Sequence, residues 1–417
     1  MKAIAFTIVA KNYIGLGQIL GQSLRRYNPE VDFRIYVADE LSEDCKDIPE
    51  CVVQAKKVIA NVTDDEWRDM AFKYDLTEFC TSIKPFCFHH VFCQGYDKAF
   101  YFDPDIYIFS TIEPLLDALD KHSMTLTPQI AGIHTHYTGE HPEWAMNVNG
   151  IFNLGFCGIK NDDWGRRVVE WWEERLRDNA FADRSVGNFT DQKWMDWMPG
   201  FLGDSLYVQQ SLGMNLAPWN FFEREVENKE GEWRVHFRTD DCQQRDDIIT
   251  FVHFAGYDYA KLKNGIVARK RIEDLKDYDD IELLGAAYRD AIVKNADVFD
   301  SFISEPYSYA TYDDGTQIAA FHRRLYHGIS NEADIKNPFA VGKGTFHDML
   351  RKKGMFIKEK IDGVSRRNIG NLEGKKRMLS ILYKVLYRIM GYKRYVMFLK
   401  SLYFYCRPEM HTFLLKK

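Results

Sequence analysis

Apolar and polar positions in the first hundred residues follow two periods, one typical of strands and one typical of helices. Residues 3–10 form a nearly continuous apolar run, which predicts a buried strand of the parallel type. In residues 15–27 the large aliphatic side chains recur at helical spacing and share one face. Residues 33–38 and 98–102 predict two further strands, with a largely helical stretch over 65–92 between them. Strand, helix, strand, helix, strand is the order of an α/β sheet.

The pattern of strands and helices continues to about residue 260. Residues 124–128 and 150–160 predict strands, and residues 164–178 predict an amphipathic helix. Residues 248–253 predict a last strand before the chain becomes helical and charged. Pro85, within the helical stretch before the third strand, predicts a break there.

A chain of 417 residues is longer than one small core requires, so we expect one large domain with additions. The large α/β domain is expected in residues 1–260, followed by a mostly helical accessory region in 261–350. A basic amphipathic tail is expected in 351–417.

The formal net charge of −6 argues against a nucleic-acid binder. Residues 371–417, however, contain eleven Lys or Arg and two Glu, a net charge of +9, so residues 1–370 carry −15. Within the tail, residues 377–402 interleave apolar and aromatic side chains with cations. Such a stretch either lies in the interface of an anionic membrane or packs as an amphipathic helix on the protein body. The excess of positive charge favours the membrane.

The eight cysteines are scattered without zinc-finger or redox spacing, which predicts reduced thiols in a cytosolic protein. The apolar start of the chain is interrupted at Lys11 and Asn12 and has no small-residue cleavage site, so a buried strand is favoured over a signal peptide. No run of about 18 apolar residues predicts a membrane-spanning helix.

Asp103 and Asp105 follow directly on the predicted strand 98–102. Because side chains alternate along an extended chain, these two carboxylates point roughly the same way. Together they offer oxygen ligands to a hard cation such as Mg²⁺ or Mn²⁺, which can bind a diphosphate. The alternative is a solvated turn in which an Asp caps the next segment.

Two further residues offer chemistry that would complement the acidic pair. His253 ends a predicted strand and could complete the metal shell, although a lone His is more often a core residue satisfied by the backbone. Lys84, on the predicted helix before the third strand, could neutralise a phosphate, although a solvated lysine is the commoner case.

Two polar pairs could contact a sugar. Asp191 and Gln192 could orient hydroxyls or act near a reacting carbon, or Asp191 could simply cap the helix that follows. Asn153 and Gly155 lie in a predicted strand, where Gly permits close approach of a ligand and Asn offers both a donor and an acceptor. A β-bulge is the alternative for this Gly.

The order of these pieces resembles glycosyltransferases of the GT-A fold, especially glycosyltransferase family 8 and related bacterial polysaccharide transferases. The resemblance covers about residues 1–260. The matching segments, in chain order, are Thr7 to Asn12, Lys84, Asp97-Lys98-Ala99-Phe100-Tyr101-Phe102-Asp103-Pro104-Asp105, Asn153-Leu154-Gly155-Phe156, Asp191-Gln192, Leu216-Ala217-Pro218-Trp219-Asn220 and His253-Phe254-Ala255-Gly256.

The resemblance implies a Rossmann-like mixed sheet flanked by helices, with a helical C-terminal extension. It implies transfer of a hexose from a nucleoside-diphosphate donor, expected to be UDP, to a cell-surface glycan of the lipid-linked oligosaccharide, capsule or O-antigen type. The anomeric configuration would be retained. The implied partners are a UDP-sugar and the glycan acceptor. The basic tail adds an anionic membrane as an expected partner, and with the scattered cysteines it predicts a cytoplasmic location, peripheral on the inner face of the cell membrane.

The resemblance also assigns roles to individual residues. Mn²⁺ or Mg²⁺ would be held by Asp103, Asp105 and His253. The donor would be bound by Thr7, Asn12, Lys84, Asp103, Asn153 and Gly155. Asp191 and Gln192 would sit near the anomeric carbon and the acceptor.

Two departures separate this chain from the family pattern. The family's Lys-Pro-Trp after His-x-x-Gly is Tyr257-Asp258-Tyr259 here, which removes a cation that would touch the diphosphate, and the Ser of Asn-Ser-Gly is Leu154. The alternatives are an inverting transferase with Asp191 as base and a non-catalytic transferase-like scaffold. A nucleotidyltransferase ranks below both, because residues 10–13 are not a Gly-rich phosphate loop.

Overall fold

The computed structural model describes residues 1–41, 48–239, 245–269, 278–300, 305–330, 332–333, 335–356 and 372–416. The described chain divides into two compact units. Unit 1 comprises Met1–Val62 and Leu76–Ser308, and unit 2 comprises Thr63–Asp75 and Tyr309–Lys417. This division differs from the three segments expected from the sequence, whose boundaries stay a prediction. Parts of the expected accessory region and tail, including 270–277 and 357–371, lie outside the described residues.

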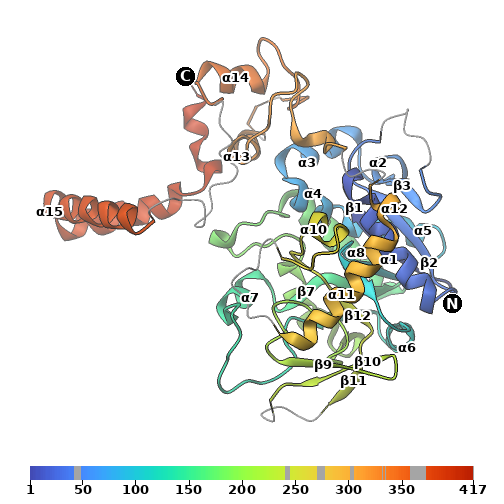
Figure 1. Cartoon of the computed structure of the whole chain (residues 1–417). Helices are drawn as coiled ribbons and strands as arrows, with labels where there is room; N and C mark the ends of the chain where they lie inside the picture. Colours follow the sequence, from blue (N-terminus) through green and yellow to red (C-terminus); the bar gives the residue numbers. More distant parts are fainter. Residues whose placement is uncertain are drawn as a thin grey trace. The chain divides into compact units, whose positions relative to one another are not determined.

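A seven-stranded mixed sheet forms the centre of unit 1, in the order β3-β2-β1-β4-β7-β6-β8 (Figure 1). Its strands are β1 (Ala3–Val9), β2 (Asp32–Val37), β3 (Val52–Gln54), β4 (Lys98–Phe102), β6 (Met124–Pro128), β7 (Phe152–Lys160) and β8 (Leu206–Val208). Neighbouring strands are parallel except at β7, which runs antiparallel to both β4 and β6. The start of β7 therefore lies beside the end of β4, so residues that follow β4 meet residues that begin β7.

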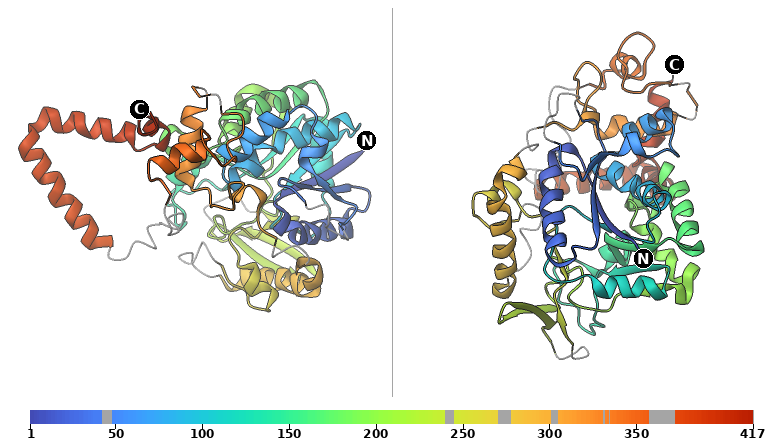
Figure 2. Two further views of the ribbon diagram at one scale, coloured as in Figure 1. Left: turned by 90° about the horizontal axis from the view of Figure 1, so that it is seen from above. Right: turned by 90° about the vertical axis from the view of Figure 1, so that its right-hand side faces the viewer.

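Helices cover both faces of this sheet. The helices of unit 1 are α1 (Ile14–Tyr27), α2 (Ala55–Val58), α4 (Leu76–Ser82), α5 (Lys84–Cys93), α6 (Glu113–Lys121), α7 (Glu143–Asn149), α8 (Asp163–Asp178), α9 (Met198–Leu202), α10 (Tyr259–Lys263), α11 (Asp279–Lys294) and α12 (Ala296–Asp300). Figure 2 shows α1 on one face and α5 and α8 on the other. The α/β class with a mixed sheet flanked by helices is confirmed.

Alternation along β1 explains why it is buried on both sides. Ala5 packs with Leu20 and Leu24 of α1 in one apolar cluster. Phe6 points the opposite way, and its ring meets that of Phe88 on α5 edge-on at 4.8 Å. An uninterrupted apolar run is thus what a strand between two helical layers needs.

Two smaller sheets complete unit 1. Strands β9 (Arg224–Lys229), β10 (Glu232–Phe237) and β11 (Asp246–Ile248) form an antiparallel sheet, and β12 (Phe251–His253) pairs with β5 (Ile106–Ile108). The single strand expected over 248–253 is therefore wrong. Asp246–Ile248 and Phe251–His253 belong to different sheets, because the backbone between them turns to other partners, with Thr250 N donating to Gly213 O at 2.8 Å.

The expected break in the helical stretch is present, two residues before Pro85, and the proline itself belongs to the helix that follows. It lies in the first turn of α5, where a missing N–H costs nothing, and the chain breaks before it at Ile83, between α4 and α5. The proline thus starts a helix instead of interrupting one. Lys84, the residue before it, is placed at the first position of α5.

Unit 2 is helical, with α3 (Asp64–Lys73), α13 (Ala320–Ile329), α14 (Phe346–Lys352) and α15 (Leu372–Tyr405). Buried Arg323 of α13 donates to the carbonyls of Ala71, Phe72 and Tyr74 and so ties α13 to α3. The expected helical C-terminal extension is confirmed. Among the described helices, none combines the length and apolar character that crossing a bilayer requires.

Candidate functional site

The acidic pair lies in the turn that follows β4. Asp103 N donates to Gly155 O of β7 at 2.7 Å, and Ile106 N closes the turn onto Asp103 O at 3.0 Å. Asp105 then leads directly into β5. The backbone of the turn is therefore fixed at both ends, and both carboxylates are only partly exposed.

Pairing of β5 with β12 brings His253 onto the acidic pair. Ile106 and His253 are opposite each other in the antiparallel register, and Phe254 N donates to Asp105 O at 2.8 Å. The imidazole Nε2 lies 3.1 Å from Asp105 Oδ1 and 3.6 Å from Asp103 Oδ2. The structure thus brings together the three residues expected as metal ligands, from segments about 150 residues apart.

Two tyrosines that the sequence analysis did not assign hold the outer carboxylate oxygens. Tyr101 Oη donates to Asp103 Oδ1, and Tyr259 Oη donates to Asp105 Oδ2 at 3.3 Å. Each aspartate therefore keeps its other oxygen toward His253. The signal for Tyr259 was present in the sequence, since Tyr259 stands in the segment that departs from the family's Lys-Pro-Trp.

The imidazole is held from the side by apolar and backbone contacts. A Cβ added at Gly155 would lie 2.4 Å from His253 Cε1, so only glycine fits beneath the ring. The ring of Trp219 meets the imidazole edge-on at 5.3 Å. Gly155 was expected to allow close approach of a sugar. In the structure it allows close approach of the His253 ring, and a contact between Gly155 and the donor stays a prediction.

Burial and the charges of neighbouring groups shift the pKa values of Asp103, Asp105 and His253. Burial raises the pKa of Asp103, and the attraction of His253 and Lys84 offsets this only in part. Burial acts the same way on Asp105, but His253 outweighs it and holds the pKa of Asp105 below its usual value. Burial would lower the pKa of His253, yet Asp105 and Asp103 together outweigh burial and raise it. The ring is therefore charged over a wider pH range than a free histidine.

The three side chains fit a divalent cation. One ligand atom from each of Asp103, Asp105 and His253 lies within 4.8 Å of the other two. Two carboxylate oxygens with one imidazole nitrogen suit Mn²⁺ and Mg²⁺ as well as other divalent ions, so the donor set does not select one metal. Three protein ligands also leave coordination positions for phosphate oxygens or water.

Lys84 is buried in the interior and forms an ion pair with Asp191. Its ammonium donates to Asp191 Oδ2 and, at 2.7 Å, to Leu154 O, and it lies 3.9 Å from the centre of the Tyr101 ring. Burial would lower the pKa of Lys84, but Asp191 and then Asp103 outweigh it and raise the pKa. The alternative of a solvated lysine is wrong, and a direct contact of Lys84 to phosphate stays a prediction.

Asp191 lies in a strained segment before a short helix. Thr190 has φ of +47°, which is rare for a β-branched residue, and its Oγ1 donates to Asp191 Oδ1 at 3.1 Å. Both carboxylate oxygens of Asp191 thus already accept hydrogen bonds, one from Thr190 and one from Lys84. Asp191 makes a tertiary contact and is not the N-cap of the helix that follows.

Gln192 fixes the start of β7. Its Oε1 accepts from Leu154 N at 3.1 Å, and its Nε2 donates to Asn149 O at 3.2 Å. Asn153 Oδ1 accepts from Gly155 N and from Asn215 Nδ2, both at 3.1 Å. Asn215 is a further site residue that the sequence did not single out.

The expected uridine-binding residues lie at β1 and the loop after it. Thr7 is fully buried and packs toward α1, where a Cβ at Gly17 would lie 3.2 Å from its methyl group. Asn12 lies in the turn after β1, and its buried Oδ1 has no hydrogen-bond partner among the described residues. Their contacts to a base stay predictions.

No family model of known proteins matches this chain. The uncharacterized proteins YfnF and YfnD of Bacillus subtilis (strain 168) are 24% and 26% identical to it over 185 and 186 residues. These matches cover 44% and 43% of this chain and 58% and 54% of the relatives. The chain thus spans somewhat more than half the length of the curated relatives that it matches.

Several solved structures of glycosyltransferases are similar to the chain. They include the galactosyltransferase LgtC in complex with donor and acceptor sugar analogues (13% identity, 73% of this chain and 98% of that chain, TM-score 0.37). They also include mouse xyloside xylosyltransferase 1 (12% identity, 52% and 87%, TM-score 0.33). TM-scores below 0.5 add no weight to a functional assignment, and membership of glycosyltransferase family 8 stays a prediction.

Binding of Mn²⁺ should release a proton near neutral pH. A ligating imidazole must be neutral, and the raised pKa of His253 means that the ring keeps its proton to higher pH than a free histidine does, so the metal has to displace that proton over a wider pH range. Metal affinity should therefore rise with pH, by up to about tenfold per unit while His253 is protonated. Calorimetry in two buffers of different ionisation enthalpy measures the release. Buffer-independent heats with a constant affinity from about pH 6 to 8 would contradict this expectation.

Proposed function

We propose that this protein is a metal-dependent glycosyltransferase that moves a hexose from a nucleoside-diphosphate donor to a glycan. The observation that carries the proposal is the convergence of Asp103, Asp105 and His253 beside the start of β7. The site lies where ligands collect in α/β sheets, at the carboxyl ends of parallel strands. UDP is the proposed donor nucleotide, with Thr7 and Asn12 on the uridine side.

The donor diphosphate is proposed to lie against the three metal ligands. A divalent cation there would bridge phosphate oxygens and neutralise the charge of the departing nucleoside diphosphate. The buried ammonium of Lys84 adds positive charge behind Asp103. Asn153 at the start of β7 is the proposed contact to the donor sugar, oriented by Asn215 and Gln192.

Retention of the anomeric configuration is favoured over inversion. A general base needs a free lone pair directed at the acceptor hydroxyl. Asp191 is buried, and its two oxygens accept from Lys84 and Thr190, so it is a poor candidate for that base. Asp191 and Gln192 instead support the donor-side wall of the site, and the inverting reaction through Asp191 is the second candidate.

A cell-surface glycan of the lipid-linked, capsule or O-antigen type is the proposed acceptor. This proposal comes from the family resemblance, whereas the proposed location at the inner face of the membrane rests on the basic tail in residues 371–417. A non-catalytic scaffold with the same fold is the competing function, and it has no need of metal-dependent nucleotide binding.

Replacing one metal ligand should remove metal-dependent donor binding. Asp103→Asn keeps the size of the side chain but removes its charge, so Mn²⁺-dependent affinity for UDP or a UDP-sugar should fall at least about 100-fold. Isothermal calorimetry with and without Mn²⁺ measures the change. Asp117→Asn, an exposed aspartate on α6, is the matched control and should bind as the unaltered protein does.

Two outcomes would count against this proposal. If the unaltered protein shows no Mn²⁺-dependent binding to any UDP-sugar, the hypothesis of a non-catalytic scaffold is supported. If Asp103→Asn retains the metal dependence, the ligand assignment is wrong.

The stereochemistry of the product should match that of the donor. Because Asp191 is engaged by Lys84 and Thr190, we expect the anomeric coupling constant of the transferred sugar to be that of the donor. Proton NMR of the purified glycoside product measures this coupling constant. An opposite coupling would establish inversion and restore Asp191 as the candidate base.

A further inference from the structure

The C-terminal helix α15 is not one straight helix but two helical arms. Gly391 within Leu372–Tyr405 has φ of +70° and ψ of +168°, outside the helical region. Residues 372–390 form the first arm and residues 392–405 the second, which Figure 2 (left) shows meeting at an angle. A glycine at positive φ accounts for the break, since other residues rarely adopt that conformation.

The first arm has one apolar face. Met378, Leu382, Val385 and Ile389 recur at intervals of four, three and four residues and therefore line up along the helix. Their exposed fractions are 64%, 50%, 46% and 75%. Within the part of the chain that the structure describes, nothing covers this stripe.

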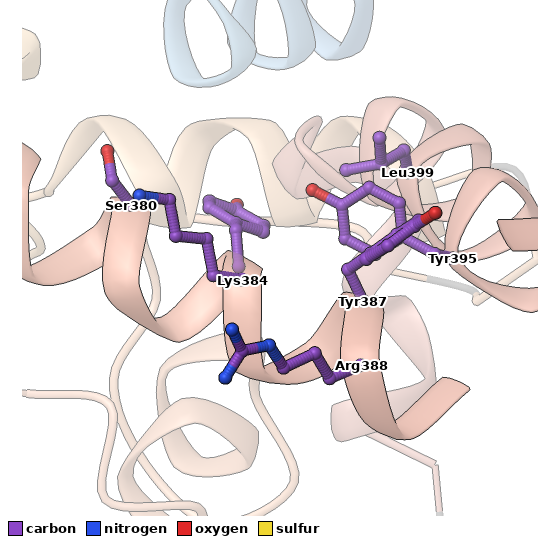
Figure 3. Close-up of a pocket in the computed structure, with 7 residues that line it drawn as sticks. Ser380, Lys384, Tyr387, Arg388, Tyr395 and Leu399 are labelled. Atoms are coloured by element: carbon purple, nitrogen blue, oxygen red, sulfur yellow. The ribbon is translucent and has the colours of Figure 1, made fainter. Parts of the chain in front are cut away.

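The polar residues of the same arm point the other way. Ser380, Tyr383, Lys384, Tyr387 and Arg388 line a hollow between the two arms, closed by Tyr395 and Leu399 of the second arm (Figure 3). The rings of Tyr387 and Tyr395 meet edge-on at 5.4 Å across the bend. The apolar stripe thus faces away from the hollow and is turned outward.

The break at Gly391 limits the number of cations beside the stripe. In an unbroken helix at 100° per residue, Lys393 and Lys400 would lie within about 60° of Met378, as Lys375 already does at the start of the arm, and would add two cations to the apolar face. Ending the first arm at Gly391 removes both lysines from that face. The bend therefore separates the amphipathic first arm from the second arm, in which apolar and charged residues are less clearly segregated.

The charge of α15 decides what can cover the stripe. The helix contains eight Lys or Arg and one Glu, a net charge of +7, and five of those cations are in the first arm. A second copy of α15 would bring +7 against +7. An anionic bilayer offers both an apolar interior for the stripe and negatively charged headgroups for the lysines and arginines.

We propose that the first arm of α15, residues 372–390, docks in the plane of an anionic lipid bilayer. The stripe from Met378 to Ile389 enters the boundary between headgroups and acyl chains, and the flanking lysines and arginines contact the phosphates. This surface goes beyond the proposed transfer reaction and needs neither donor nor acceptor. Its failure and the failure of the proposed function can therefore be told apart.

Vesicle flotation of the full chain tests the proposal. The unaltered protein should float with vesicles of phosphatidylcholine and phosphatidylglycerol, and much less with phosphatidylcholine alone. Leu382→Gln with Ile389→Gln leaves the charge unchanged but removes two apolar side chains from the stripe. The partition constant of the protein onto the anionic vesicles should therefore fall at least about tenfold. The matched control, Ser380→Gln with Tyr383→Gln on the opposite face, should stay within about threefold.

Three outcomes would overturn the proposal. The first is that both double variants lose vesicle binding equally, or that neither loses it. The second is equal binding of the unaltered protein to neutral and anionic vesicles. The third is a change in melting temperature or oligomeric state, without vesicles, for Leu382→Gln with Ile389→Gln, because a face buried on the protein body or on a second copy would respond in that way.

Discussion

The candidate site depends on the pairing of two three-residue strands, β5 and β12. That pairing, together with a hydrogen bond from His253 N to Leu216 O at 2.8 Å, places His253 within hydrogen-bond distance of Asp105, which lies 148 positions earlier in the chain. So short a pair is marginal by itself, and the apolar core supplies what the pairing lacks. Phe251 of β12 packs edge-on against Phe102 at 5.4 Å. Geometry at the three ligands is therefore a consequence of how the core is packed.

The buried ion pair between Lys84 and Asp191 is the second constraint. It joins the start of α5, the carbonyl of Leu154 at the start of β7, and the strained segment at Thr190. Removing one member of such a pair costs about 3–5 kcal/mol, because the other charge is left buried and alone. The pair thus ties the donor-side wall to the sheet, and Lys84 acts on Asp103 through the interior.

Sequence reasoning recovered the parts of the site that depend on local pattern. Asp103 and Asp105 were identified because they follow an apolar strand, and His253 because its segment occupies the expected place in the order of motifs. The partner of Lys84 could not be predicted, since Asp191 lies 107 residues away and only the antiparallel β7 brings them together. Tyr259 was missed for the same reason, since it lies 154 residues from Asp105. Tyr101 lies only two residues before Asp103, a spacing that places both side chains on one side of an extended chain, so its contact was open to prediction and was overlooked. The split of 248–253 followed from backbone partners that periodicity does not reveal.

The most direct test of the metal site is anomalous scattering from crystals grown with Mn²⁺ and UDP. A metal held by these three side chains should give one strong manganese peak within about 2.5 Å of His253 Nε2 and of one oxygen from each of Asp103 and Asp105. UDP phosphate oxygens should complete the shell. Bound UDP with no manganese peak at these three side chains, or a peak held by other residues, would contradict it.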